Sequence, residues 1–145
     1  MDKSQALKGL HVVEFGHIVA GPLMSGYLAS FGAEVIKVES HKAPDLSRVT
    51  TGVYKDGIPS PNRAGTFVTN NTGKWGLCLN LKHPRARELV HRLVAWADVL
   101  VENYAPGVMA KWGYGYEQLS DIKPDLIMIS ATLQGQTGPH AHQPG

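Results

Sequence analysis

The chain has little cysteine, little net charge and no long apolar run. Cys78 is the single cysteine among 145 residues, which excludes an internal disulfide and a cysteine-based zinc site. A formal net charge of +2 is too small to indicate a nucleic-acid-binding protein. No apolar stretch approaches the roughly 18–20 residues of a membrane-spanning helix, and the first residues lack the apolar core of a secretory signal. We therefore expect a cytoplasmic protein that binds neither nucleic acid nor membranes.

The length and composition are those of one globular domain. Hydrophobic residues make up 43% of the chain and charged residues 18%, close to the averages for globular proteins, which argues against intrinsic disorder. A length of 145 residues falls within the range of about 100–200 residues that one domain occupies.

Short apolar runs alternate with amphipathic segments along the chain. The runs predict strands, and they cover residues 10–15, 34–39, 75–81, 99–101 and 125–131. Apolar residues at helical spacing predict helices that begin at Pro22 and Pro84, with shorter helical stretches at 108–112 and 116–122. This alternation predicts an α/β fold with an open, mostly parallel sheet and Rossmann-like winding.

Residues 40–71 break this pattern. The segment is rich in proline, glycine, serine, threonine and asparagine and shows no apolar periodicity. Loops of this length inside a compact domain are usually functional or disordered.

Three loops are predicted to meet at one edge of the sheet, because ligands of open α/β sheets bind beyond the carboxyl ends of the strands. They are residues 16–22, 102–107 and 133–139, and the first leads into a helix N-terminus that favours anions. Lys74 and Lys82 flank the third apolar run and are candidates for positive charge at this edge. Alternatively, the loop glycines serve turn geometry alone and the two lysines are solvated.

The common nucleotide motifs are incomplete. A dinucleotide-binding G-x-G-x-x-G is missing, since Gly16 and Gly21 stand five residues apart with no glycine between them. Glu39 ends the second apolar run, where a ribose-binding acid belongs, and an NAD-dependent dehydrogenase domain rests on this residue alone. A P-loop fails because Val68 and Trp75 replace its first glycine and its Ser/Thr.

Few side chains suggest catalysis or metal binding. His140 and His142 have no further evident ligand, so we expect no metal site. His17, in the first strand-to-helix loop, is the histidine best placed for chemistry, and a structural hydrogen bond is the alternative. Cys78 lies inside a predicted strand, where a small buried hydrophobic residue is the expected role.

Six segments occur in the order and spacing of family III CoA-transferases, and the sequence resembles this family from about residue 7 to residue 145. The family includes formyl-CoA transferase, CaiB/BaiF-type carnitine CoA-transferases and α-methylacyl-CoA racemase. The segments are LKGLHVVEFGHIVAGP, FGAEVIKVES, TGKWGLCLNLK, ADVLVENYAPGVMAKWGYGYEQL, KPDLIMISAT and GQTGPHAHQPG.

The resemblance implies an enzyme that acts on coenzyme A (CoA) thioesters, with acyl-CoA and a carboxylic acid acceptor as substrates and no metal. Members of the family have a Rossmann-like large domain and a smaller domain, and two chains interlock as a homodimer. By position, the family's CoA contacts fall on His17, Val19, Ala20, Leu79, Lys82, Asn103, Tyr104, Val108 and Lys111.

Several positions depart from the pattern of formyl-CoA transferase. Val19 stands where those members carry glutamine, and Ser40 stands where they carry arginine. Trp75 replaces a basic residue, and Asn80 turns the common LDL into LNL. The loss of the glutamine and the arginine argues against formyl or oxalyl specificity, and the expectation of CoA binding remains.

The resemblance places the catalytic residues of the family after Gly145. In the transferases an aspartate forms an acyl anhydride and then a CoA thioester, and in the racemases a histidine and an aspartate move the α-proton. We therefore expect residues 1–145 to be the N-terminal, CoA-binding part of the large domain of a longer protein, inactive by itself. An α-methylacyl-CoA racemase-type epimerase and a non-catalytic CoA-binding subunit remain as alternatives.

Overall fold

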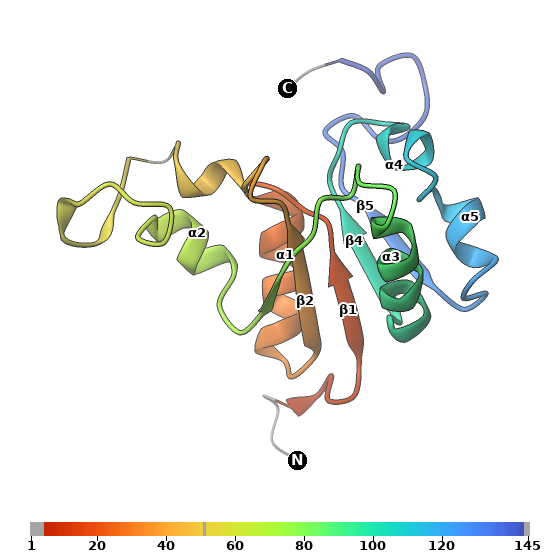
Figure 1. Cartoon of the computed structure of the whole chain (residues 1–145), viewed down its shortest axis with the longest axis horizontal. Coiled ribbons are helices and arrows are strands. Elements are labelled where there is room, and N and C mark those ends of the chain that lie inside the picture. The colour runs from red at the N-terminus through yellow and green to blue at the C-terminus, as the bar shows by residue number, and fades with distance from the viewer. Residues whose placement is uncertain (1–4, 51, 144–145) are drawn as a thin grey trace.

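The computed structural model describes residues 5–50 and 52–143 as an α/β structure (Figure 1). The strands are β1 (His11–Glu14), β2 (Glu34–Glu39), β3 (Trp75–Cys78), β4 (Val99–Glu102) and β5 (Ile127–Ser130). The α-helices are α1 (Ala20–Ser30), α2 (Gly65–Asn70), α3 (Ala86–Trp96), α4 (Val108–Lys111) and α5 (Tyr116–Ser120). Two short 3₁₀ turns, η2 (Leu46–Arg48) and η3 (Lys55–Gly57), precede α2.

The five strands form one parallel sheet in the order β3-β2-β1-β4-β5, which confirms the predicted open α/β fold. In the register, Val12 of β1 pairs with Val35 of β2 on one side and with Val99 of β4 on the other. The strand order reverses at β1, because β2 and β3 extend to one side and β4 and β5 to the other. The loops that follow β1 and β4 therefore leave the same edge of the sheet side by side.

Two apolar clusters cover the two faces of the sheet. Val13 and Leu100 pack on one face with Val90 and Val94 of α3, and all four are fully buried. On the other face Val12 and Val35 pack against Met24 and Leu28 of α1, with Val99 and Val101. Burial on both faces explains why these strands are continuous apolar runs rather than alternating ones.

Residues 40–50 and 52–71 form a lobe beside the sheet, and α2 lies within it (Figure 1). The lobe packs closely against α1, since a Cβ atom added at Gly26 would lie 3.0 Å from the carbonyl oxygen of Asn70. Among the described residues, no helix has the length and apolar character needed to cross a bilayer.

The prediction that Cys78 is a buried strand residue is wrong. β3 is an edge strand, and the Cys78 thiol is exposed with its Sγ 3.6 Å from His41 Nδ1. The strand also ends earlier than predicted, at Cys78, although the Leu79 N–H still donates to the carbonyl oxygen of Glu39 at 2.9 Å.

Candidate functional site

The β1–α1 loop and the β4–α4 loop are joined by one side chain at the point where the strand order reverses. Asn103 Oδ1 accepts a hydrogen bond from the His17 N–H at 2.6 Å, and its Nδ2 donates to the His17 carbonyl oxygen at 2.9 Å. Gly21 allows this close approach, because a Cβ there would lie 3.1 Å from Asn103 Oδ1. The two loops are thus held in a fixed relation at the edge where open α/β sheets bind ligands.

Two glycines of the first loop serve packing. A Cβ atom added at Gly16 would lie 3.0 Å from the Gly21 Cα and 2.9 Å from Glu14 Oε1. The absence of side chains at both positions lets the loop fold back onto the start of α1.

Gly135 and Gly138, in the loop after β5, have φ angles of +84° and +95° and provide turns that other residues adopt at a cost.

The rings of His17 and Tyr104 form the centre of the site. His17 Nε2 lies 3.3 Å from the Tyr104 hydroxyl, and the Tyr104 ring packs edge-on against Trp112 with centroids 5.1 Å apart. Burial lowers the pKa of His17 below its ordinary value. The nearby carboxylates, most strongly Asp45, act to raise this pKa, but the effect of burial is larger. Burial, helped by Glu102, raises the pKa of Tyr104. At neutral pH both groups are therefore uncharged.

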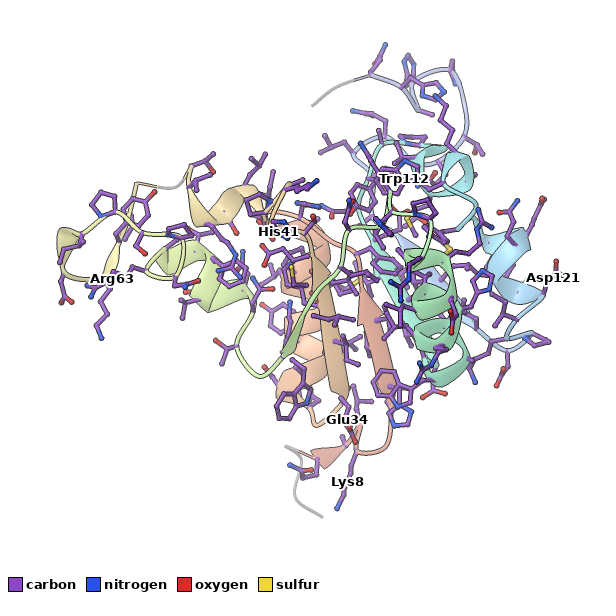
Figure 2. The ribbon with its side chains drawn as sticks, in the orientation of Figure 1. Lys8, Glu34, His41, Arg63, Trp112 and Asp121 are labelled. Carbon is purple, nitrogen blue, oxygen red and sulfur yellow. The ribbon has the colours of Figure 1, made fainter. Side chains whose placement is uncertain are left out.

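Two cavities flank this pair, and Tyr104 lines both. The first, of about 560 Å³, lies between the N-terminus of α1, the β4–α4 loop and residues 131–133 and 141–143. The second, of about 320 Å³, lies between the ends of β2 and β3 and the ring of Trp112. Figure 2 shows His41 and Trp112 near this end of the sheet, with Lys8 and Glu34 at the opposite end.

Seven of the nine residues predicted to contact CoA line these two cavities. Val19, Ala20 and Asn103 line the first cavity, and His17, Leu79 and Lys82 line the second, with Tyr104 common to both. The other two predicted contacts, Val108 and Lys111, line neither cavity. Both lie in α4, and Lys111 is exposed.

A cluster of buried charges lies beneath the first loop. Lys37 Nζ is 2.8 Å from Glu14 Oε1 and 3.0 Å from Asp45 Oδ2, and it donates to the Gly16 carbonyl oxygen at 2.8 Å. Lys74 Nζ is 2.7 Å from Glu14 Oε2. Both lysine side chains are at most 4% exposed. The suggestion that Lys74 supplies free positive charge is therefore wrong, since its charge is neutralised by Glu14.

Glu14, Lys37 and Asp45 also belong to the site, although the sequence did not predict them there. A signal was present for two of them, because Glu14 and Lys37 interrupt apolar runs that are buried on both faces. Charged groups at such positions require buried partners. Asp45 carried no comparable signal, since it lies in the non-periodic segment 40–71.

Glu39 is not free to hold a ribose. Arg48 binds its carboxylate with both Nε and Nη2, at 2.8 and 2.7 Å, and the Asp45 N–H donates to it at 2.7 Å. The Arg48 guanidinium also lies 3.4 Å above the Phe67 ring. The dinucleotide alternative rested on Glu39 alone, and its carboxylate is occupied by these contacts.

His140 and His142 do not gather further metal ligands. Within residues 5–50 and 52–143, no group of three or more histidine, cysteine, aspartate or glutamate side chains could hold a metal ion.

The strand order and the cavities where it reverses define a Rossmann-like α/β protein. The sequence profile of CoA-transferase family III matches residues 7–145, and the chain belongs to this family.

Curated relatives carry CoA-transferase names. The chain is 39% identical over 145 residues to succinyl-CoA:glutarate CoA-transferase of Mus musculus, covering 99% of this chain and 32% of that protein. It is 37% identical over 140 residues to the succinyl-CoA–L-malate CoA-transferase beta subunit of Chloroflexus aurantiacus, covering 96% of this chain and 33% of the relative. The chain thus spans about a third of the length of these relatives.

Solved structures share the fold. The protein Rv3272 from Mycobacterium tuberculosis matches with a TM-score of 0.85 and 36% identity, over 99% of this chain and 39% of that one. A CaiB/BaiF family protein from Brucella suis matches with a TM-score of 0.83 and 41% identity, over 96% of this chain and 36% of that one.

Proposed function

We propose that the protein is a CoA-transferase that moves CoA between two carboxylic acids, and that residues 1–145 form the N-terminal, CoA-binding part of its large domain. The family and the names of the relatives support this proposal. The proposed enzyme is a cytoplasmic homodimer of interlocked chains that requires no metal.

The joining of the two loops by Asn103 carries the proposal for the CoA site. It brings residues far apart in the sequence around two adjacent cavities at the carboxyl edge of the sheet. The proposed CoA contacts are His17, Val19, Ala20, Leu79, Lys82, Asn103, Tyr104, Val108 and Lys111.

Each part of CoA has a chemical counterpart among these residues. Lys82 and Lys111 supply cations for the phosphates, and the first N–H groups of α1 lack intrahelical partners and favour anions. Apolar side chains such as Leu79 and Val19 provide surface for the adenine ring and the pantetheine arm.

The proposed chemistry is nucleophilic catalysis by a carboxylate that the resemblance places after Gly145. The carboxylate attacks the thioester carbonyl, the C–S bond breaks, and CoA leaves as a thiolate, so that the acyl group and the aspartate form a mixed anhydride. The thiolate attacks the aspartyl carbonyl and releases the donor acid, which leaves an aspartyl-CoA thioester. The acceptor carboxylate attacks that thioester, and the released thiolate then attacks the acyl carbonyl of the new anhydride, which regenerates the aspartate.

The role of the described residues is to bind and orient CoA. Asp98 directly precedes β4 and Asp125 lies two residues before β5, so both lie at the amino end of the parallel sheet, opposite the cavities. Asp98 contacts His11 and Lys123 there. Neither carboxylate is proposed as the nucleophile.

A non-catalytic CoA-binding subunit is the second candidate, because one relative is named as a beta subunit. The test is mass spectrometry of protein purified from its own cells, before and after incubation with succinyl-CoA. A mass more than twice 15.7 kDa with a hydroxylamine-sensitive adduct supports the transferase. A long chain without an adduct favours the racemase-type epimerase, and a mass of 15.7 kDa favours the subunit.

The CoA site itself is tested by titration of the protein with CoA. We expect Lys82→Ala to raise the Kd about tenfold, because one charge-assisted hydrogen bond to phosphate is lost. Lys8→Ala is the matched control, since Lys8 is exposed and lies at the opposite end of the sheet (Figure 2). Equal Kd values for the two variants would show that Lys82 does not contact CoA.

A further inference from the structure

The β1–α1 loop contains a residue in an unfavourable backbone conformation. Ile18 has a φ angle of +64°, in the left-handed region that β-branched side chains rarely adopt. Such a conformation persists only where surrounding contacts hold it, and it is concentrated at functional sites. Ile18 immediately precedes Val19, the residue before the first turn of α1, and it lines the 560 Å³ cavity together with Val19 and Ala20.

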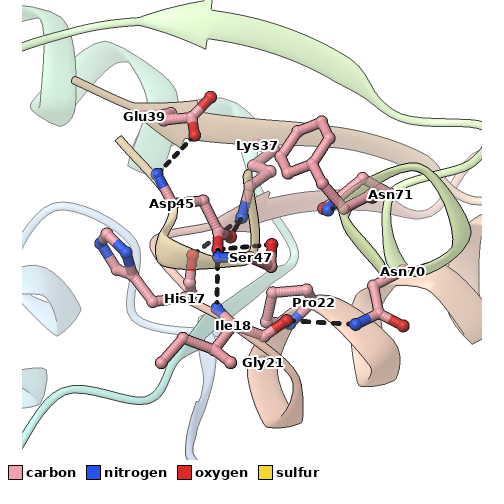
Figure 3. A network of polar contacts seen from close by, with 12 residues as sticks. His17, Ile18, Gly21, Pro22, Lys37, Glu39, Asp45, Ser47, Asn70 and Asn71 are labelled. Atoms are coloured by element: carbon pink, nitrogen blue, oxygen red, sulfur yellow. Dashed lines mark hydrogen bonds and ion pairs between the residues drawn. The ribbon is translucent and has the colours of Figure 1, made fainter. Parts of the chain in front are cut away.

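Two side chains of the lobe, Asp45 and Asn70, hold the Ile18 backbone from both sides (Figure 3). The Ile18 N–H donates to Asp45 Oδ1 at 3.0 Å, and the Ile18 carbonyl oxygen accepts from Asn70 Nδ2 at 3.1 Å. Asp45 precedes the 3₁₀ turn η2, and Asn70 ends α2. The lobe thus reaches back to one residue of the candidate site from two places in the sequence.

Asp45 is itself held rigidly. It is fully buried, and its Oδ1 accepts hydrogen bonds from the Ser47 N–H and hydroxyl at 2.9 and 2.7 Å. Its other oxygen lies 3.0 Å from Lys37 Nζ. Burial alone would raise the pKa of Asp45, but the Ser47 hydrogen bonds and the Lys37 charge outweigh it and hold the pKa below its ordinary value. The carboxylate is therefore charged and fixed at neutral pH.

We propose that Asp45 and Asn70 are positioning residues for CoA. They hold the Ile18 peptide in its left-handed conformation and so set where the backbone of Val19 and Ala20 lies against the ligand in the larger cavity. This assignment rests on the proposed function, since the ligand is the CoA thioester. It also gives residues 40–71 a function, which is to fix the loop between β1 and α1.

We call the two hydrogen bonds from Asp45 and Asn70 to the Ile18 peptide the clamp. The test uses Ile18→Gly, because glycine adopts the left-handed conformation without these hydrogen bonds. In Asn70→Ala, the Ile18 carbonyl loses its donor, and we expect the Kd for CoA to rise about fivefold. Glycine adopts positive φ angles freely, so Ile18→Gly combined with Asn70→Ala should bring the Kd back towards the wild-type value. Ile18→Ala in the same background removes the side chain and keeps the unfavourable conformation, so it should not rescue binding.

The measurement is calorimetric titration of the protein, at its native length, with CoA, alongside thermal unfolding of each variant. Asn62→Ala is the matched control, because Asn62 lies in the same lobe and its Oδ1 accepts only from Arg48 among the contacts described. It should leave the Kd unchanged. If Asn70→Ala does not fold, Asn70→Asp keeps the size of the side chain and removes the donor.

The outcomes separate the clamp from a purely structural role and from the proposed function. A lower Tm with an unchanged Kd in Asn70→Ala, or a raised Kd that Ile18→Gly fails to restore, would overturn the positioning role. Rescue by glycine and not by alanine supports it. A wild-type protein that does not bind CoA would overturn the proposed function, and this assignment with it.

Discussion

His17 shows how the surroundings of one residue set its charge. Its backbone is held by Asn103 on both sides, and its ring faces the Tyr104 hydroxyl. Burial lowers the pKa of the ring below 6.5, so the folded protein disfavours the imidazolium form. The neutral ring keeps a nitrogen lone pair available to accept a hydrogen bond.

This shift predicts a loss of stability in weak acid. As the pH falls below 6.5, His17 takes up a proton in the unfolded chain before it does so in the folded protein, and the free energy of unfolding decreases. The His17→Gln variant should lack this component. Urea unfolding at several pH values from 8 to about 5 measures it. His140→Gln, which changes an exposed residue, is the control, and an equal pH dependence in all three proteins would contradict the prediction.

At the residue scale, the sequence predicted the position of some site residues and not their contacts. His17 was selected because it follows the first strand, and this places it correctly at the carboxyl edge. Asn70 and Asp45 could not be found, because their partner Ile18 is 52 and 27 residues away and no periodicity links the segments. The prediction of free positive charge at Lys74 fails because the sequence does not show that Glu14 lies 2.7 Å from its ammonium group.

At the scale of elements, the sequence predicts all five strands and four of the five α-helices, including the short helices α4 and α5. β2 has the predicted bounds, since its β-branched residues form a clear apolar run. The amphipathic helix α3 was also predicted, from apolar residues at helical spacing. Helix α2, with the sequence GTFVTN, is not predicted because its residues have low helix propensity and the segment around it has no apolar periodicity. Its packing against α1 and the Asn70 hydrogen bond to Ile18 hold it in place.

A buried ion pair should contribute more to the free energy of unfolding than an exposed one. Glu14→Gln leaves Lys74 buried without its carboxylate partner and leaves Lys37 with Asp45 alone, and we expect a loss of about 3–5 kcal/mol in the free energy of unfolding. Asp56→Asn removes the partner of Arg63 in a surface pair and should cost about 0–1 kcal/mol. Denaturant unfolding compares the two variants. A cost below 1 kcal/mol for Glu14→Gln would show that the cluster is not held as charged pairs.

At the scale of the whole molecule, the sheet has two open edges. β3 and β5 are its outermost strands, and each pairs with one neighbour in the described residues. Large apolar side chains lie exposed there, with Trp75 at 71% and Ile127 at 57% of full exposure. Tyr27 of α1 adds to them at 61%. Unpaired edges with exposed apolar residues favour association.

We therefore expect the 145-residue chain to associate in solution. Size-exclusion chromatography with light scattering should give a mass above 15.7 kDa. Trp75→Lys should reduce the association, because a charge on an edge strand opposes pairing. Val53→Lys is the control, since Val53 is 67% exposed and belongs to neither β3 nor β5. A monodisperse monomer for the unaltered chain would contradict the expectation.

The strand order also determines how the protein assembles while it is synthesised. Residues up to Cys78 already contain β1, β2 and β3, together with Asp45 and Asn70, so three of the five strands and the lobe can form first. The other side of β1 stays unpaired until Val99–Glu102 has left the ribosome, and Asn103 follows directly after it. Contacts between such distant segments form slowly. The nascent chain is thus most open to misassembly in the interval between β3 and β4, and the last hydrogen bonds to His17 end that interval.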